Sequence, residues 1–141
     1  MIDPCEVPAV EAEELLARFI FSSRHIRKSN ATVKPEGFIP HLAELSVTRH
    51  REAGEREIWD AGQAIASVRE RTLYGRGDVG AHVFLEKDLS VQAAPVMGHS
   101  RLPDNPNHAN VTGWPKDDKA RQKMLAIEIA ARAKFVQSPD S

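Results

Sequence analysis

Apolar side chains recur every three to four residues in two long segments, which is the pattern of an amphipathic helix. One segment spans residues 55–71 and the other spans residues 117–135. The apolar face of the first consists of Ile58, Ala61, Ile65 and Val68. The apolar face of the second consists of Ala120, Met124, Ile127, Ala131 and Phe135, flanked by Leu125 and Ile129. We expect a helix in each segment, with Asp117 or Asp118 capping the second.

Two further segments fit more than one kind of element. Residues 11–21 place apolar side chains on one helical face with acids opposite, so we expect a helix there. The end of this segment, residues 18–26, fits a strand equally well. Residues 78–87 fit a short helix capped by Asp78, and a strand is the alternative.

Three shorter stretches predict β-strands, at residues 45–50, 89–96 and 108–113. A loop rich in Pro, Asn, Asp and Gly, residues 97–106, joins the last two. Three to four helices with a small sheet of short strands make an α+β fold.

The length of 141 residues is typical of one domain, and no linker, repeat or low-complexity tract divides the chain. We therefore expect a single compact domain over residues 1–141. We expect flexible ends at residues 1–10 and 137–141.

Charge and cysteine content restrict the setting and the partners. The net charge of −1 argues against a dedicated nucleic-acid binder. Its distribution is uneven, because residues 1–17 carry five acids and no base, whereas residues 18–34 carry five bases, one histidine and no acid. The single cysteine, Cys5, excludes an internal disulfide and a cysteine-based zinc site. No apolar run approaches membrane-spanning length, so we expect a cytoplasmic protein with no membrane partner.

The loop at residues 103–110 is the first candidate for chemistry. An imidazole, here His108, can transfer a proton near neutral pH, and the amides of Asn105 and Asn110 can orient a carbonyl or a phosphate. Asn, Asp and Pro are also ordinary turn formers, so the alternative is a loop that only joins two strands.

A dense basic stretch is the second candidate. Its cationic side chains suit a phosphate site. They are Arg24, His25, Arg27 and Lys28. The alternative is a solvated basic edge, or one that pairs with the acidic N-terminal arm.

The strand at residues 45–50 offers a third candidate. Alternation puts His50 on the same face as two hydroxyl side chains and points Arg49 to the other face. His50 would serve acid–base chemistry and Arg49 would bind phosphate, unless this is simply the solvent face of an antiparallel strand. The six histidines show no pair spaced for one helix face, so we expect no metal site, and no phosphate-loop or dinucleotide motif implies a cofactor.

The order of several short motifs resembles a group of small uncharacterised bacterial proteins. The motifs are Leu45-Ser46-Val47 with Arg49, and Asn105-Pro106-Asn107-His108-Ala109. The resemblance covers about residues 18–115. It implies a bacterial source, and because that group has no established activity it assigns no role to any residue here.

These patterns leave three functional hypotheses. The small size, the missing motifs and the balanced charge favour a protein-binding or regulatory module. The first alternative is a small phosphodiesterase or nucleotide-handling enzyme, in which His108 and at least two basic side chains would meet in one cleft. The second alternative is RNA or DNA binding through residues 18–34. The apolar C-terminal helix would suit either a deep core or a homodimer interface.

Overall fold

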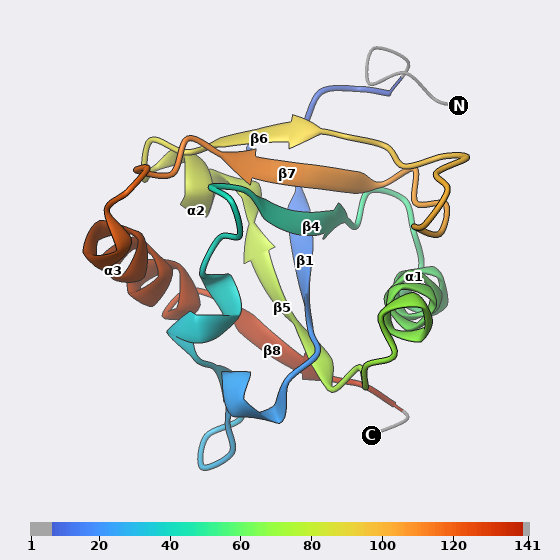
Figure 1. Ribbon diagram of the computed structural model, residues 1–141, viewed down its shortest axis with the longest axis horizontal. Coiled ribbons are helices and arrows are strands. Elements are labelled where there is room, and N and C mark those ends of the chain that lie inside the picture. The colour runs from blue at the N-terminus through green and yellow to red at the C-terminus, as the bar shows by residue number, and fades with distance from the viewer. Residues whose placement is uncertain (1–6, 140–141) are drawn as a thin grey trace.

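A computed structural model describes residues 7–139, which form one α+β domain around a six-stranded antiparallel sheet (Figure 1). The strand order in the sheet is β6-β7-β4-β1-β5-β8. These strands are β1 (Leu15–Ile20), β4 (Leu45–Arg49), β5 (Gly75–Gly80), β6 (Ser90–Ala93), β7 (His108–Thr112) and β8 (Lys134–Gln137). A separate two-stranded hairpin consists of β2 (Ile26–Arg27) and β3 (Thr32–Val33). The predicted fold class is therefore confirmed.

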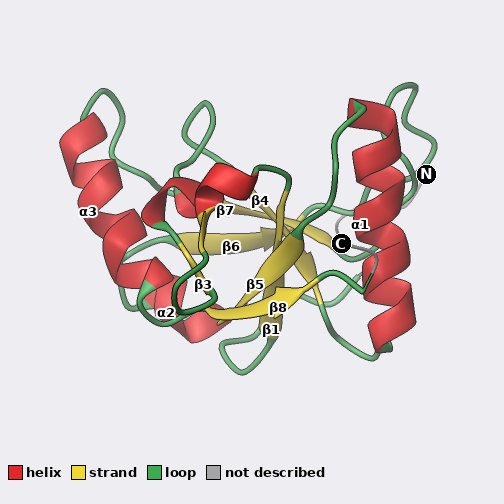
Figure 2. Cartoon of the chain, turned by 90° about the horizontal axis from the view of Figure 1, so that it is seen from below, coloured by secondary structure: helices red, strands yellow, loops and turns green. Residues whose placement is uncertain are grey.

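Helices cover both faces of the sheet, and Figure 2 shows α1 and α3 on opposite sides of it. The α-helices are α1 (Glu55–Arg69), α2 (Ala81–Leu85) and α3 (Lys119–Ala130), and the 3-10 helices are η2 (Ser23–His25) and η3 (Pro35–Phe38). The larger apolar core lies under α2, α3 and η3, and a smaller core lies under α1. Successive side chains of β1 enter the two cores in turn, Leu16 and Ile20 the larger one and Ala17 and Phe19 the smaller one.

The helix expected at residues 11–21 is wrong, because β1 occupies residues 15–20; the alternative strand at residues 18–26 is right only for residues 18–20 and 26. β1 is the strand between β4 and β5, and both of its faces are covered. A strand buried on both faces is apolar at most positions, so it lacks the polar–apolar alternation that would identify it.

The segment at residues 78–87 contains both of the expected elements, the end of strand β5 followed by helix α2. Asp78 is inside β5 and caps no helix, and α2 begins only at Ala81. Glycine is unusual within a strand, but here it allows close packing. A Cβ atom at Gly75 would lie 2.6 Å from Cε1 of Phe135 on β8, so only glycine fits at this position.

The helix expected at residues 117–135 is shorter, since α3 spans Lys119–Ala130, and the face that it buries differs from the expected one. Asp118 caps α3 by accepting a hydrogen bond from the backbone N–H of Arg121 (3.0 Å), and the chain then returns as β8, which the sequence did not predict. The face of α3 that packs on the sheet consists of Leu125, Ala126, Ile129 and Ala130. Met124 and Ile127, which we expected to be buried, are exposed. Val68 of α1 is likewise exposed, because α1 packs through Ile58, Gly62 and Ala66.

The strands expected at residues 45–50, 89–96 and 108–113 are confirmed as β4, β6 and β7. Of the expected flexible ends, residues 1–6, including Cys5, and residues 140–141 lie outside the described residues. Within the described parts of these ends, the backbone carbonyls of Pro8 and Ala9 accept hydrogen bonds from Arg49, and Gln137 is the last residue of β8.

The sheet opens between β1 and β4. β1 pairs with β5 through all six of its residues, but only Leu16 and Ala17 pair with β4. The two strands therefore part from Arg18 onward. This opening, next to the C-terminal end of α1, positions the candidate site.

Candidate anion-binding site

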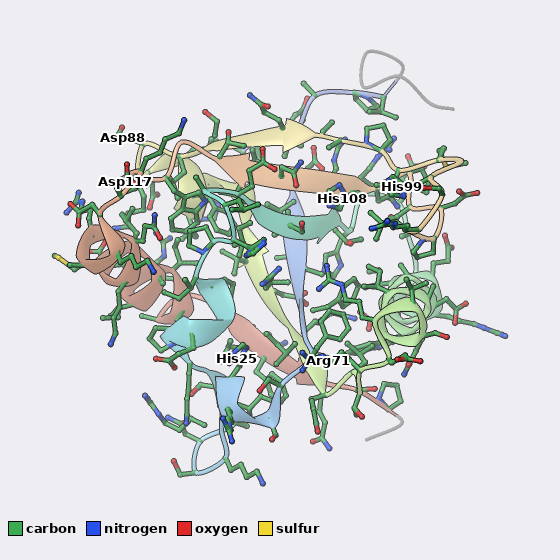
Figure 3. All side chains as sticks on the ribbon, viewed as in Figure 1. His25, Arg71, Asp88, His99, His108 and Asp117 are labelled. Atoms are coloured by element: carbon green, nitrogen blue, oxygen red, sulfur yellow. The ribbon has the colours of Figure 1, made fainter. Side chains whose placement is uncertain are left out.

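A cavity of about 460 Å³ lies at the C-terminal end of β1. We call it the arginine cleft; its lining residues are Arg18, Phe19, Phe21, Ser22, His25, Arg69 and Arg71. They come from β1 and the segment after it, from η2, and from the end of α1. Three guanidinium groups and an imidazole line the cleft, and none of these lining residues is acidic. Figure 3 shows His25 and Arg71 near the C-terminal end of β1, with His108 farther along the sheet.

A second, much smaller cavity adjoins the arginine cleft and shares four of its residues. Its volume of about 30 Å³ leaves room for about one water molecule. The shared residues are Arg18, Phe19, Phe21 and Arg69. The cavity is also lined by Ser46 and Thr48 of β4 and by His108 of β7. The arrangement thus brings His108 next to two arginines of the cleft.

Arg18 is fixed by the backbone rather than by an acid. Its Nε–H donates to the carbonyl of Gly37 (2.9 Å), and its Nη1 donates to the carbonyl of Ser46 (3.0 Å). No carboxylate within residues 7–139 forms an ion pair with it. Burial and the nearby charge of Arg69 lower the pKa of Arg18 to about 10. Arg18 therefore stays charged at pH 7 without an acidic partner in the described residues, and a bound anion would stabilise that charge.

Arg69 and Arg71 reach the same cavity because of how α1 ends. Glu70 adopts a left-handed conformation (φ 53°) and reverses the chain, and the N–H of Arg71 then donates to the carbonyl of Ala66 (2.9 Å). The guanidinium of Arg69 lies over the ring of Phe21, 5.7 Å from its centroid. In the part of the chain that the structure describes, neither arginine pairs with an acid.

His25 is held in η2 with its ring half-buried in the cleft. Its backbone N–H donates to the carbonyl of Ser22 (3.1 Å). Burial and the positive charges of Arg18 and Lys34 lower the pKa of His25 below its usual value, although Glu36 partly opposes them. The imidazole is therefore neutral at pH 7, and a bound anion would favour its protonation.

His108 has a defined tautomer. Its Nδ1 lies 2.9 Å from the backbone carbonyl of Ala94. A carbonyl can only accept, so the interaction assigns the proton to Nδ1 and leaves Nε2 with a lone pair. Burial lowers the pKa of His108, although the hydrogen bond to Ala94 partly opposes this effect. A neutral imidazole of this kind is able to accept a proton at pH 7.

The other residues of the predicted basic site lie outside the arginine cleft. The side chains of Arg24, Arg27 and Lys28 are exposed on η2, on β2 and just after β2. They extend the basic surface beside His25. Lys28 also lines a separate cavity with Tyr74 and Phe135.

Arg49 lies elsewhere, with only 1% of its surface exposed. Its guanidinium donates to both carboxylate oxygens of Glu14 (2.7 and 2.8 Å) and to the carbonyls of Pro8 and Ala9. These contacts fix the segment before β1 to β4, and Arg49 does not line the arginine cleft.

His50 belongs to a second buried charge network, beneath the start of α1. Its Nε2 lies 2.9 Å from Oδ1 of Asp78, which also accepts from Nε of Arg76 (3.0 Å). Arg76 in turn donates two hydrogen bonds to Glu55 and lies over the ring of Trp59. These contacts join α1 to β4 and β5.

The two predicted asparagines have different surroundings. Asn105 is buried; its Nδ2 donates to the hydroxyl of Thr48 (3.1 Å), and its Oδ1 accepts from the N–H of Asn107. It therefore positions a hydroxyl that lines the small cavity. Asn110 lies on β7 opposite Ser46 and lines neither cavity.

Sequence reasoning therefore found two of the residues that come together, His25 and His108. It counted Arg18 in the basic stretch without naming it as a site residue, and it missed Arg69 and Arg71. The Arg-x-Arg pair at the end of a predicted helix was the available signal, but nothing in the sequence connected it to β1.

Comparisons of the chain with protein-family models, with curated protein sequences and with solved structures gave no match. Among residues 7–139, no group of three or more His, Cys, Asp or Glu side chains is arranged to hold a metal ion. No helix in that range has both the length and the apolar character that crossing a membrane requires.

Proposed function

We propose that this protein binds a phosphate-containing ligand, a nucleotide or a nucleic-acid strand, in the arginine cleft. One observation carries the proposal: three arginines and His25 line a single cavity to which no lining residue contributes a carboxylate. Arginine is well suited to phosphate because its planar group donates several parallel hydrogen bonds.

The surroundings of the cleft favour a nucleic-acid or nucleotide phosphate over a small inorganic anion. Phe21 gives the cleft an aromatic wall, with Phe19 beside it at a centroid distance of 6.4 Å. Arg24 and Arg27 continue the positive charge outward along η2 and β2. A basic groove with aromatic rings is the usual arrangement for binding single strands.

This proposal replaces the protein-binding module as the preferred hypothesis, because no arrangement of comparable specificity supports the module. The exposed apolar side chains Met124 and Ile127 on α3 are what a protein partner or a second copy would cover. That hypothesis stays a prediction, as do the bacterial source and the cytoplasmic location.

A second candidate function is hydrolysis of the bound phosphodiester. The observation that favours it is the Nε2 of His108, which has no hydrogen-bond partner among residues 7–139 and lies beside a cavity of water-molecule size that Arg18 and Arg69 also line. His108 would accept a proton from that water as the water oxygen bonds to phosphorus. The ester P–O bond to the leaving sugar oxygen breaks in the same step, that oxygen takes up a proton from solvent, and the guanidinium groups would stabilise the charge that develops.

One experiment tests both candidates. Short labelled single-stranded RNA and DNA are titrated with the protein while anisotropy is read, and the same samples are then run on a denaturing gel. If three arginines each contact a phosphate, affinity should fall roughly twentyfold between about 50 and about 200 mM salt. Absence of binding at low salt would contradict the proposal.

Cleavage of the strands that disappears in His108→Gln while binding persists would establish hydrolysis. Strands that stay intact with the parent protein would reject hydrolysis.

The affinity for the oligonucleotide should rise as the pH falls from about 7.5 to about 5.5. The pKa of His25 is lowered in the free protein, so the ring is neutral at the upper pH; a phosphodiester raises that pKa and binding takes up a proton. In His25→Gln the pH dependence should become weaker, whereas in His41→Gln, an exposed histidine outside the cleft, it should be unchanged. Equal pH profiles for the parent protein and His25→Gln would contradict a role for His25.

A further inference from the structure

A further cavity, of about 470 Å³, lies beside the arginine cleft. We call it the aromatic pocket; its lining residues are Ser23, Ile26, Lys28, Ala31, Thr72, Tyr74, Phe135 and Gln137. Its volume is within the range of small-molecule sites. Two aromatic rings and two aliphatic side chains provide an apolar surface, and hydroxyl, amide and ammonium groups lie among them.

Two stretches of chain contribute neighbouring residues to the two cavities. Along η2 and its cap, Ser22 faces the arginine cleft and Ser23 faces the aromatic pocket. After α1, Arg71 faces the cleft and Thr72 faces the pocket. The two cavities therefore flank the same two stretches of chain, and a ligand with two linked parts would reach both by crossing over one of these stretches.

The backbone of Tyr74, which lines the aromatic pocket, is held by two hydrogen bonds. Its backbone N–H donates to the carbonyl of Ile20 (2.9 Å), and its carbonyl accepts from the N–H of Ser138 (3.0 Å). These bonds tie Tyr74 to the end of β1 and to the residue after β8. Phe135 is fixed on β8 by its close packing against Gly75. The aromatic surface is therefore preorganised, which lowers the entropy cost of binding a flat ligand.

We propose that the aromatic pocket is a nucleobase subsite, which takes the base of a nucleotide whose phosphate lies in the arginine cleft. This inference rests on the proposed function and specifies its ligand. A nucleobase is flat and apolar on its faces and polar at its edges, which matches rings and aliphatic groups interspersed with hydroxyl and amide groups. The ammonium group of Lys28 suits a further phosphate at the rim. A free nucleotide and one unit of a strand share this chemistry.

The test measures binding of pyrophosphate, ADP and a tetranucleotide by calorimetry, in the full chain and in single variants. ADP should bind about tenfold more tightly than pyrophosphate, because base stacking adds to the same phosphate contacts. Tyr74→Leu should remove this advantage and leave pyrophosphate binding unchanged. Tyr74→Phe should keep it, which shows that the ring matters rather than the hydroxyl. Arg71→Gln should weaken all three ligands, whereas Arg121→Gln, on the exposed surface of α3, should weaken none.

The possible failures are distinguishable. If pyrophosphate binds but ADP binds no more tightly, or if Tyr74→Leu keeps the advantage of ADP, the nucleobase subsite is rejected and the phosphate site stands. If neither pyrophosphate nor ADP binds, the proposed function itself fails. Tighter binding of the tetranucleotide than of ADP identifies a nucleic-acid strand as the ligand, and weaker binding identifies a free nucleotide.

Discussion

Arg69→Gln should weaken oligonucleotide binding about tenfold, because it removes a charged hydrogen-bond donor from the arginine cleft. The fold should tolerate the change, since the side chain of Arg69 contacts the face of Phe21 and pairs with no acid among the described residues. Removing the charge also relieves the repulsion that, together with the larger effect of burial, lowers the pKa of Arg18. Anisotropy titrations over a range of salt concentrations measure the effect, and the slope of affinity against salt should fall by about 0.7.

Arg56→Gln is the matched control for this variant. Arg56 is an exposed arginine on the same helix, at its other end, with only a 4.0 Å ion pair to Asp60. Both variants change the net charge equally, so a general electrostatic effect would weaken both. Equal loss in the two variants would contradict a specific site, and so would full affinity in Arg69→Gln.

Glu14→Ala should lower the free energy of unfolding by about 3 kcal/mol. Its partner Arg49 is fully buried, and Glu14 is the one carboxylate among residues 7–139 that pairs with it. The variant therefore leaves a buried cation with only two backbone carbonyls as acceptors. Urea unfolding at pH 7 measures the change, and Glu13→Ala, at the exposed neighbouring position, should have little effect.

The same pair predicts how stability depends on pH. Burial opposes ionisation of Glu14, but hydrogen bonds from Arg49 and from the Glu11 backbone, with the charge of Arg49, outweigh it and lower the pKa. A carboxylate with a lowered folded-state pKa contributes stability above its ordinary value of 4.5, and loses that contribution as the pH falls through the folded value. The difference between the parent protein and Glu14→Ala should therefore shrink in acid. A constant difference down to low pH would show that the ion pair is not its source.

The parts of the fold that sequence patterns predicted are those with one exposed face. α1 has a polar face and an apolar face, and β7 alternates buried with partly exposed residues, so local periodicity was enough. β1 is covered on both faces and looked like a helix. β5 contains three glycines, and only the position of Phe135 on β8 explains why Gly75 must lack a side chain. In each of these failures, the decisive neighbour is distant in the sequence.

The candidate site could likewise be predicted only in part from the sequence. His108 and the stretch from Arg18 to Lys34 could be identified as unusual from composition alone. Their relation to Arg69 and Arg71 depends on where β1 separates from β4 and on how α1 ends at Glu70. Arg49 and His50 looked equally suitable, but the structure pairs them with Glu14 and Asp78. Whether an arginine is paired depends on tertiary contacts, which a single sequence does not reveal.

The arginine Nε–H signals of the protein, followed by NMR while pyrophosphate is added, test the anion site most directly. We predict that the signals of Arg18, Arg69 and Arg71 shift together and saturate with one affinity, while those of Arg56 and Arg132, outside the cleft, stay in place. Shifts confined to Arg24 and Arg27, or no saturable shift in the three cleft arginines, would contradict the proposal that the cleft binds phosphate.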